Sequence, residues 1–325
     1  MQLFLGSGIR VNCSEDIFVD ALSVKGKKVL VTHAHTDHAK ITKSNEYFLT
    51  PETSALLSAG EKENVNCIPQ GKRFSVNGFN ISFHNSGHIC GSSQILLENS
   101  TSLAITSDFK LQQNLLTKPA EILHADLLLI EATYGTPQHS FKKRAEIYEE
   151  MKHWVNDALS KNHFVILGGY SSGKAQELTK FCNEYLSAAP LVYKTIYEKN
   201  KALEGCGISL GDYMLLNNNY NESNILIVPP HLINDNLIAA LSEQLKKKIS
   251  AAVATGMPFG HFKRFELSDH ADFNQLLYYV AHSRPKAVFT YHGHAEHLAR
   301  QIRKKLGIPA QPLSKAQKNL LEFSG

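Results

Sequence analysis

The segment 31–38 reads Val31-Thr32-His33-Ala34-His35-Thr36-Asp37-His38 and says more about the architecture than any other part of the chain. It places four possible metal ligands directly after a run typical of a buried strand. His33 and His35 are two positions apart, so on an extended chain they project to the same side. Asp37 and His38 lie on the next turn and can face a second ion. Imidazole and carboxylate suit zinc and similar ions; the alternative is a histidine-rich surface loop that arises by chance or binds metal only adventitiously.

Three further motifs follow the first in order. They are Ser86-Gly87-His88-Ile89-Cys90-Gly91-Ser92, then Thr106-Ser107-Asp108-Phe109, and near the C-terminus Tyr291-His292-Gly293. Together with segment 31–38, they resemble the motif series of the metallo-β-lactamase superfamily. The resemblance implies two divalent ions, most simply zinc, with manganese as the alternative. One ion is expected on His33, His35, His88 and Asp108, and the other on Asp37, His38, Asp108 and His292. A hydroxide between the two ions is the expected nucleophile.

Two more motifs resemble the β-CASP nuclease branch of this superfamily. Leu129-Ile130-Glu131-Ala132-Thr133-Tyr134-Gly135 is similar to its E-x-T-Y-G element, and Leu267-Ser268-Asp269-His270-Ala271-Asp272 to its S-x-H-x-D element. By this resemblance Glu131 orients His270, and His270 acts near the leaving group. Asp37, Glu131 and His270 form the expected catalytic group. The chain is most similar to the compact prokaryotic members, including archaeal RNA 3′-end processing factor-like proteins and ligase-associated exonucleases.

The order of predicted strands and helices along the chain indicates two domains. The first third reads as short strands, among them 28–32, 103–106 and 127–131. An alternation of strands and amphipathic helices follows, with helix 145–159 first, and indicates a parallel sheet with helical crossovers. Strand 287–291 and helix 295–306 follow this alternation and are assigned to the same domain as the first third of the chain. The expected fold is α/β, a four-layer αββα metallo-β-lactamase fold formed by 1–134 and 266–325, with a small α/β (β-CASP) domain inserted at 135–265.

The segment Gly168-Gly169-Tyr170-Ser171-Ser172-Gly173-Lys174-Ala175 needs a separate interpretation. It fits the G-x-x-x-x-G-K core of a phosphate-binding P-loop, but Ala175 stands where Ser or Thr would hold magnesium. It also resembles a β-CASP element. Free N–H groups at a helix start favour phosphate, so Ser172, Gly173 and Lys174 are candidate nucleic-acid contacts. A purely structural turn is the alternative.

Composition sets the remaining limits. The net charge of +4 permits a polyanionic partner without requiring one. The five cysteines form no C-x-x-C pair, which favours buried free thiols in a reducing compartment. No apolar run reaches the roughly 20 residues that cross a bilayer, and the N-terminus does not resemble a signal peptide. We therefore expect a cytoplasmic protein without a membrane partner, and a homodimer is one expected assembly.

These observations predict a two-metal phosphodiesterase, an exo- or endonuclease that cuts single-stranded nucleic acid, with RNA favoured over DNA. A DNA exonuclease of the ligase-associated repair type is the first alternative. A small-ester or lactam hydrolase is the second, and it would not need Glu131, His270 or the inserted domain. A silent nucleic-acid-binding subunit is the third, although the expected ligand positions are all occupied.

Overall fold

The computed structural model describes residues 2–12, 15–58, 62–313 and 318–319. The chain separates into two compact units. The first contains Met1–Gln112, Lys118–Ser140 and His270–Gly325, and the second contains Gln113–Thr117 and Phe141–Asp269. The main changes of unit fall a few residues after the predicted positions 134/135 and 265/266. The short segment Gln113–Thr117 was not expected in the second unit.

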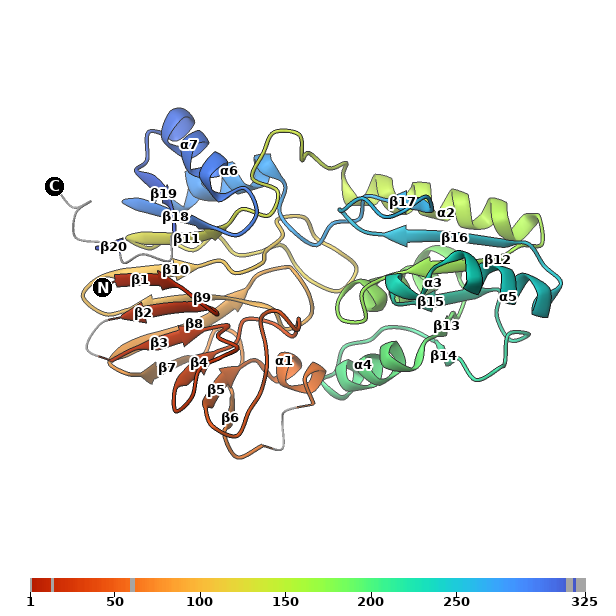
Figure 1. Cartoon of the computed structure of the whole chain (residues 1–325), viewed down its shortest axis with the longest axis horizontal. Coiled ribbons are helices and arrows are strands. Elements are labelled where there is room, and N and C mark those ends of the chain that lie inside the picture. The colour runs from red at the N-terminus through yellow and green to blue at the C-terminus, as the bar shows by residue number, and fades with distance from the viewer. Residues whose placement is uncertain (1, 13–14, 59–61, 314–317, 320–325) are drawn as a thin grey trace. The chain divides into compact units, whose positions relative to one another are not determined.

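Two mixed sheets form the frame of the first unit (Figure 1). In spatial order the first sheet contains β20 (Lys318–Asn319), β1 (Gln2–Leu5), β2 (Ile9–Asn12), β3 (Ile17–Val19), β4 (Lys28–Leu30), β5 (Glu46–Leu49) and β6 (Val65–Cys67). The second contains β19 (Ala310–Pro312), β18 (Ala287–Tyr291), β11 (Leu127–Glu131), β10 (Ser102–Ile105), β9 (Ser93–Glu98), β8 (Phe79–Asn85) and β7 (Arg73–Val76). Pairing is parallel from β3 to β6 and from β10 to β19.

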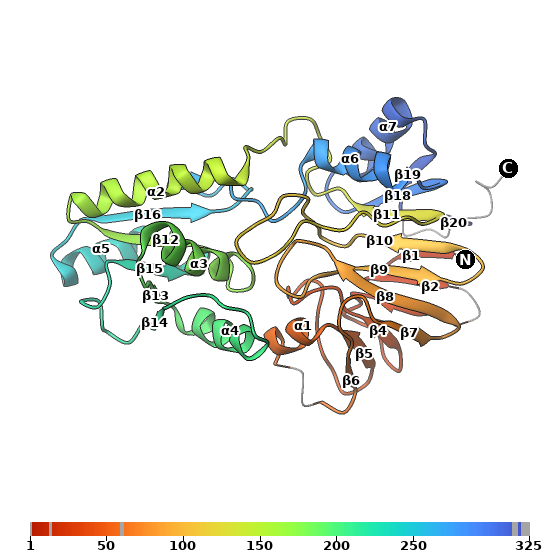
Figure 2. The ribbon, with the colours of Figure 1, turned by 180° about the vertical axis from the view of Figure 1, so that it is seen from behind.

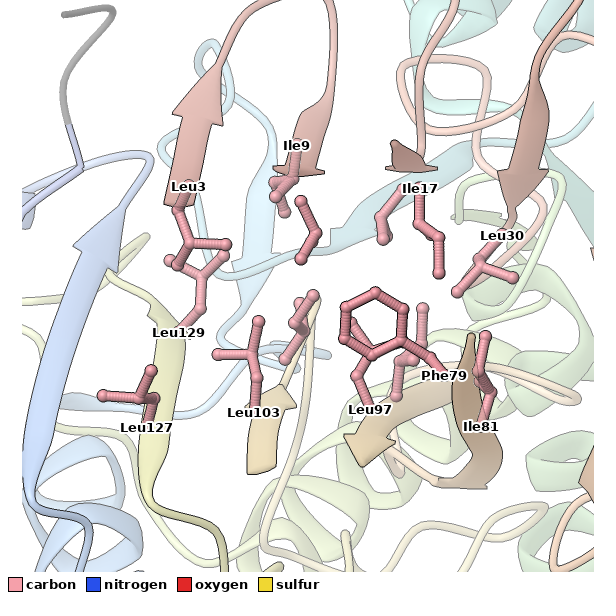
Figure 3. Packing of buried hydrophobic residues seen from close by; sticks show 14 of the residues in the cluster. Leu3, Ile9, Ile17, Leu30, Phe79, Ile81, Leu97, Leu103, Leu127 and Leu129 are labelled. Carbon is pink, nitrogen blue, oxygen red and sulfur yellow. The ribbon is translucent and has the colours of Figure 1, made fainter. Parts of the chain in front are cut away.

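The core of this unit lies between the two sheets. Figure 3 shows Leu3, Ile9, Ile17 and Leu30 of the first sheet facing Phe79, Ile81, Leu97, Leu103, Leu127 and Leu129 of the second. Because side chains alternate along a strand, residues between these positions point to the outer faces. Burial of this inner surface is the main force that holds the sheets together.

Two helices cover the outer face of the second sheet, and one short helix lies beside the edge of the first. On the second sheet, α6 (Phe273–Ser283) and α7 (Ala295–Leu306) pack through Leu276, Val280 and Ile302 against Leu128, Ile130 and Val288. On the first sheet, α1 (Pro51–Leu56) contacts β6, and the adjacent Leu57 packs on the outer cluster. The predicted four-layer αββα architecture is confirmed.

The second unit is a parallel α/β sheet, seen from behind in Figure 2. Its spatial order is β14 (Met214–Leu215), β13 (Leu191–Val192), β15 (Ile225–Val228), β12 (Phe164–Gly168), β16 (Ile249–Ala254) and β17 (Lys263–Phe265). One face packs against α2 (Arg144–Ser160), α3 (Lys174–Leu186) and α4 (Lys194–Gly205). The short η1 (Pro230–Leu232) and α5 (Asp235–Leu245) belong to the other face. The predicted alternation of strands and crossover helices is confirmed.

Individual elements differ from the sequence predictions in instructive ways. Strands 127–131 and 287–291 and helix 295–306 have the predicted bounds. No helix is predicted from the sequence at the positions of α1, α4 and α6. Helix α6 starts at Asp272, whose side chain accepts a hydrogen bond from Gln275 N, and a lone aspartate there is a weak start signal.

The cysteine prediction holds only in part. The four described cysteines, Cys67, Cys90, Cys182 and Cys206, form no disulfide, and Cys13 lies outside the described residues. Cys90 and Cys182 are buried as expected, but Cys67 is exposed because it ends the edge strand β6. The helices in the described part of the chain are all too short or too polar to span a bilayer.

Candidate metal centre

Three histidines and one aspartate of the first unit, His33, His35, His88 and Asp108, meet where strands end. One ligand atom from each lies within 4.8 Å of the others. His35 Nδ1 is 3.1 Å from His33 Nε2 and 3.2 Å from His88 Nε2. Asp108 Oδ2 is 3.6 Å from His33 Nε2 and 3.7 Å from His88 Nε2. A tetrahedron around zinc, with bonds of about 2.0–2.1 Å, has edges of about 3.3–3.4 Å. The donor set therefore fits one four-coordinate ion.

Asp108 is the hub of a larger histidine cluster. Besides the two contacts above, its Oδ2 atom lies 3.5 Å from His38 Nε2 and 3.9 Å from His270 Nε2. Burial alone would raise the pKa of Asp108, but the charges of the surrounding imidazoles, His270 foremost, lower it below its ordinary value. Asp108 is therefore a carboxylate at neutral pH, and its Oδ2 atom faces His33 and His88 of one predicted ligand set and His38 of the other.

The surroundings of His33 favour the neutral form of its imidazole. It is fully buried, and its Nδ1 atom lies 3.0 Å from Thr32 Oγ1, which leaves Nε2 to face the other donors. Burial, followed by the charges of neighbouring histidines, holds the pKa of His33 well below its usual value. A neutral imidazole keeps the lone pair that a metal ion requires.

The residues of the second predicted ligand set lie farther apart and are more exposed than those of the first. His38 Nε2 lies 3.8 Å from Asp37 Oδ2, and the His38 and His292 rings are 6.0 Å apart between centroids. The Asp37 side chain is 80% exposed, and His292 is also exposed. The structure thus brings His38 and Asp108 together, with Asp37 and His292 beside them but outside the tight donor groups of the described residues.

Sequence reasoning missed Asp20. This buried residue follows β3, and its Oδ2 atom lies 2.8 Å from His38 Nδ1. It also accepts hydrogen bonds from Thr32 N at 2.8 Å and from Thr32 Oγ1 at 2.7 Å. Burial would lower the pKa of His38, but the hydrogen bond and charge of Asp20, followed by the charge of Asp108, raise it to about 10. Asp20 orients an expected ligand from behind; its only sequence signal is an acidic residue at the end of a strand.

Glu131 and His270 meet as the motifs predicted. Glu131, at the end of β11, is fully buried, and His270 Nδ1 lies 3.1 Å from both of its carboxylate oxygens. Phe109 N donates to Glu131 Oε1 at 3.0 Å, and the Thr133 hydroxyl donates to Oε2. With Nδ1 held by a carboxylate, the Nε2 atom of His270 faces Asp108.

Unusual backbone conformations bring these ligands together. Asp20, Ser107 and His292 have φ angles of 52°, 50° and 60°, which non-glycine residues rarely adopt. Gly87 has a φ of 70°, and a Cβ atom there would lie 2.5 Å from the carbonyl oxygen of Lys110. A glycine is therefore needed for the His88 loop to pack against the chain that follows Asp108.

The candidate phosphate-binding groups of the loop 168–175 contact other groups of the second unit. Lys174 is buried, and its ammonium lies 2.7 Å from Glu177 Oε2 and also pairs with Asp269. Gly173 N donates to Gln176 Oε1 at 2.7 Å, and Ser172 Oγ accepts from Lys199 Nζ at 2.6 Å. The groups predicted to hold phosphate are thus engaged within the second unit. Nucleic-acid binding by Ser172, Gly173 and Lys174 stays a prediction, and for Lys174 it would require two ion pairs to open.

Other histidines near the motifs lie outside the metal groups found among the described residues. His84 contacts Glu121 Oε2 at 3.0 Å and Ser82 Oγ at 2.9 Å, which indicates a structural role. His294 and His297 follow His292, and neither belongs to a donor group.

Comparisons with known proteins agree with this geometry. A family profile described as "Zn-dependent metallo-hydrolase RNA specificity domain" matches residues 260–311, which include His270 and His292. The chain is 28% identical over 288 residues to a "Probable DNA ligase" of Opitutus terrae, covering 86% of this chain and 28% of that protein. It is 26% identical over 197 residues to an "RNase J-like protein" of Methanocaldococcus jannaschii, covering 59% and 47%. It is 38% identical over 113 residues to the "Transcription termination factor FttA" of a Lokiarchaeum, covering 33% and 18%. The chain thus spans less than half the length of each.

A solved structure shares the fold over almost the whole chain. It is the crystal structure of a protein of unknown function from Enterococcus faecalis V583, with a TM-score of 0.68, 14% identity and coverage of 98% and 99%. Histidine and aspartate donors at the strand ends of an αββα sandwich, together with the profile over residues 260–311, indicate a metallo-hydrolase of the metallo-β-lactamase fold. The profile and these relatives indicate the β-CASP nuclease family within that superfamily.

Proposed function

We propose that the protein is a two-metal nuclease that hydrolyses phosphodiester bonds in single-stranded nucleic acid. The observation that carries this proposal is the shared position of Asp108, within 3.9 Å of the expected ligands His33, His38 and His88 and of His270. The expected metal ligands and a candidate proton donor thus surround one carboxylate, which supports the proposal.

The residues divide the chemistry between them. His33, His35, His88 and Asp108 would hold one ion, and Asp37, His38, Asp108 and His292 the other; the nitrogen and oxygen donors suit zinc and also manganese. When bound, the ions supply Lewis acidity toward the phosphate oxygens and a nucleophile derived from water at neutral pH.

His270 would complete the reaction as general acid. As the new P–O bond to the water oxygen forms and the bond to the leaving oxygen breaks, His270 Nε2 gives its proton to that oxygen. The products are a phosphate monoester and an alcohol. Glu131 accepts the Nδ1–H hydrogen bond and so fixes the ring. Such a proton donor contributes about 10²–10⁴-fold in rate.

RNA is the first candidate substrate, because the profile at 260–311 is that of an RNA specificity domain and a relative is described as RNase J-like. DNA is the second candidate, because the relative described as a probable DNA ligase aligns with 86% of this chain. A reducing compartment such as the cytoplasm is part of this proposal, and the lack of disulfides among the described cysteines supports it. Homodimer formation stays a prediction.

The test is a cleavage assay with end-labelled RNA and DNA, single- and double-stranded, in the presence of zinc or manganese. We expect cleavage of single-stranded substrates, and the product ladder reports polarity and mode. His33→Ala and Asp108→Asn should lose activity, whereas His84→Ala, a histidine outside the metal groups, should keep it. Hydrolysis of small esters or lactams but not of nucleic acid would contradict the proposal.

A further inference from the structure

Lys110 is a buried lysine that neither the ligand sets nor the proton donor accounts for. Its side chain is 1% exposed, and its ammonium donates a hydrogen bond of 3.0 Å to the carbonyl oxygen of His270. A buried ammonium is costly, and an apolar side chain of similar length often stabilises a fold at least as well. A lysine here therefore suggests a purpose other than packing.

The backbone of Lys110 connects two parts of the metal centre. Lys110 N donates to Ser86 O at 2.8 Å, next to the tight turn at Gly87 that presents His88. On its N-terminal side, Asp108 lies two residues away. Lys110 thus sits where the His88 loop and the Asp108 strand end meet.

The same segment also holds the chain around His270. Ala271 N donates to Phe109 O at 2.7 Å, and Lys110 Nζ binds the carbonyl of His270 itself. Phe109 N meanwhile binds Glu131, the carboxylate that faces the His270 ring. Residues 108–110 therefore fix the backbone and, through Glu131, the ring of His270 relative to Asp108.

We propose that Lys110 is a positioning residue for His270, which aligns the proton donor with the leaving oxygen. This inference rests on the proposed function. Loss of the ammonium leaves the metal ligands in place but lets the His270 backbone shift. Only the proton transfer should then suffer, and a misplacement of about 1 Å can cost about 10²-fold in rate.

The experiment compares two substrates of the full-length, metal-loaded protein. An oligonucleotide has an alkoxide leaving group that needs a proton, whereas a nucleotide p-nitrophenyl ester releases a stable phenolate that does not. Lys110→Met should lower kcat about 10²-fold with the oligonucleotide and leave the ester rate close to that of the wild type. Lys110→Arg, which keeps a buried cation and donor, should recover most of the loss.

A double mutant tests whether Lys110 acts through His270. If it does, Lys110→Met should have little further effect on oligonucleotide cleavage in a His270→Ala background, because the group that it aligns is gone. Metal content and melting temperature of each variant, measured in parallel, show whether the fold and the ions are intact.

The outcomes separate the two proposals. Equal losses with both substrates, lower metal content in Lys110→Met, or additive losses in the double mutant would overturn the positioning role and leave the proposed function standing. A wild-type protein that cleaves the ester but no oligonucleotide would overturn the proposed function and the Lys110 role with it.

Discussion

Each unit buries a cluster of ionisable side chains, and the two clusters are balanced in different ways. In the second unit, Arg144 donates to Glu177 at 2.7 and 2.6 Å and to Asp269 at 2.9 Å. Lys174 pairs with the same two carboxylates, and Tyr148 donates to Glu177. Two cations meet two anions, so this cluster is neutral without any ligand.

In the first unit, carboxylates face imidazoles instead. Asp20 contacts His38, Asp108 lies among four histidines, and Glu131 contacts His270. Guanidinium and ammonium groups have no lone pair to offer, whereas an imidazole that gives up its proton does. The comparison indicates that the ion pairs of the second unit stabilise the fold by themselves. The donors of the first unit, by contrast, suit a metal ion.

The largest effect should come from removing a ligand of the first unit. His88→Ala deletes one corner of the donor tetrahedron, and nuclease activity should fall by at least about 10³-fold, because the electrostatic stabilisation of the transition state is lost with the ion. Cleavage of end-labelled oligonucleotides together with zinc content measures this. Removal of metal from the wild type by a chelator should have the same effect and should be reversed by zinc or manganese. A chelated protein that stays fully active would show that the cluster is not the catalytic centre.

Breaking the cluster of the second unit should instead cost stability. Glu177→Leu leaves two buried cations with one carboxylate, and loss of one partner from a buried ion pair costs about 3–5 kcal/mol. Urea unfolding monitored by circular dichroism measures this change. Glu184→Leu on the same helix is the matched control. Its ion pair with Lys180 is partly exposed, and such pairs are worth less than about 1 kcal/mol. Equal losses from both substitutions would contradict a special role for the buried cluster.

A third prediction concerns Asp20, which supports the metal centre from behind. Asp20→Asn removes the charge beside His38, and substitutions of this kind weaken metal binding about 10–100-fold. Competition with a chromophoric chelator measures the affinity. In the metal-free protein the pKa of His38 is raised to about 10. Protonated His38 therefore stabilises the folded state. This contribution to the free energy of unfolding is fully present below the ordinary pKa of about 6.5 and is lost as pH rises through 10. Asp20→Asn should flatten that dependence, and an unchanged profile would contradict the assigned hydrogen bond.

The sequence anticipated the residues whose spacing is local or whose motif order is distinctive. His33, His35 and His38 leave one strand end together, and the parallel strands β10, β11 and β18 bring Asp108, Glu131 and His292 to the same edge of a sheet. Parallel strands place their carboxyl ends side by side, so these residues converge once the strands are recognised.

The sequence could not anticipate contacts that depend on how separate loops pack. Asp20 and Lys110 each stand alone in the sequence, and their partners are distant along the chain. Lys174 also has a partner that the local sequence does not reveal. Its position at the start of α3 favours phosphate binding, which stays a prediction, but Asp269, with which it forms an ion pair, lies 95 residues away.

The smallest effect lies at the opposite ends of the strands that carry the ligands. Asp126 accepts hydrogen bonds from Ser102 N at 2.9 Å and from Lys286 Nζ at 2.8 Å, and so joins the starts of β10, β11 and β18. The hydrogen bond from Lys286, followed by those from Ser102, lowers the pKa of Asp126 to about 2. Because the folded pKa is depressed, this stability is present above the ordinary value of about 3.9 and is lost as pH falls through 2.

Lys286 is mostly exposed, so solvent screens the pair and Asp126→Asn should cost less than about 1 kcal/mol. Acid unfolding of wild type and variant should differ above pH 4 and converge near pH 2, with nuclease activity unchanged. A variant with wild-type acid stability but impaired cleavage would reverse the assignment, because the starts of these strands would then contribute to chemistry and not only to the fold.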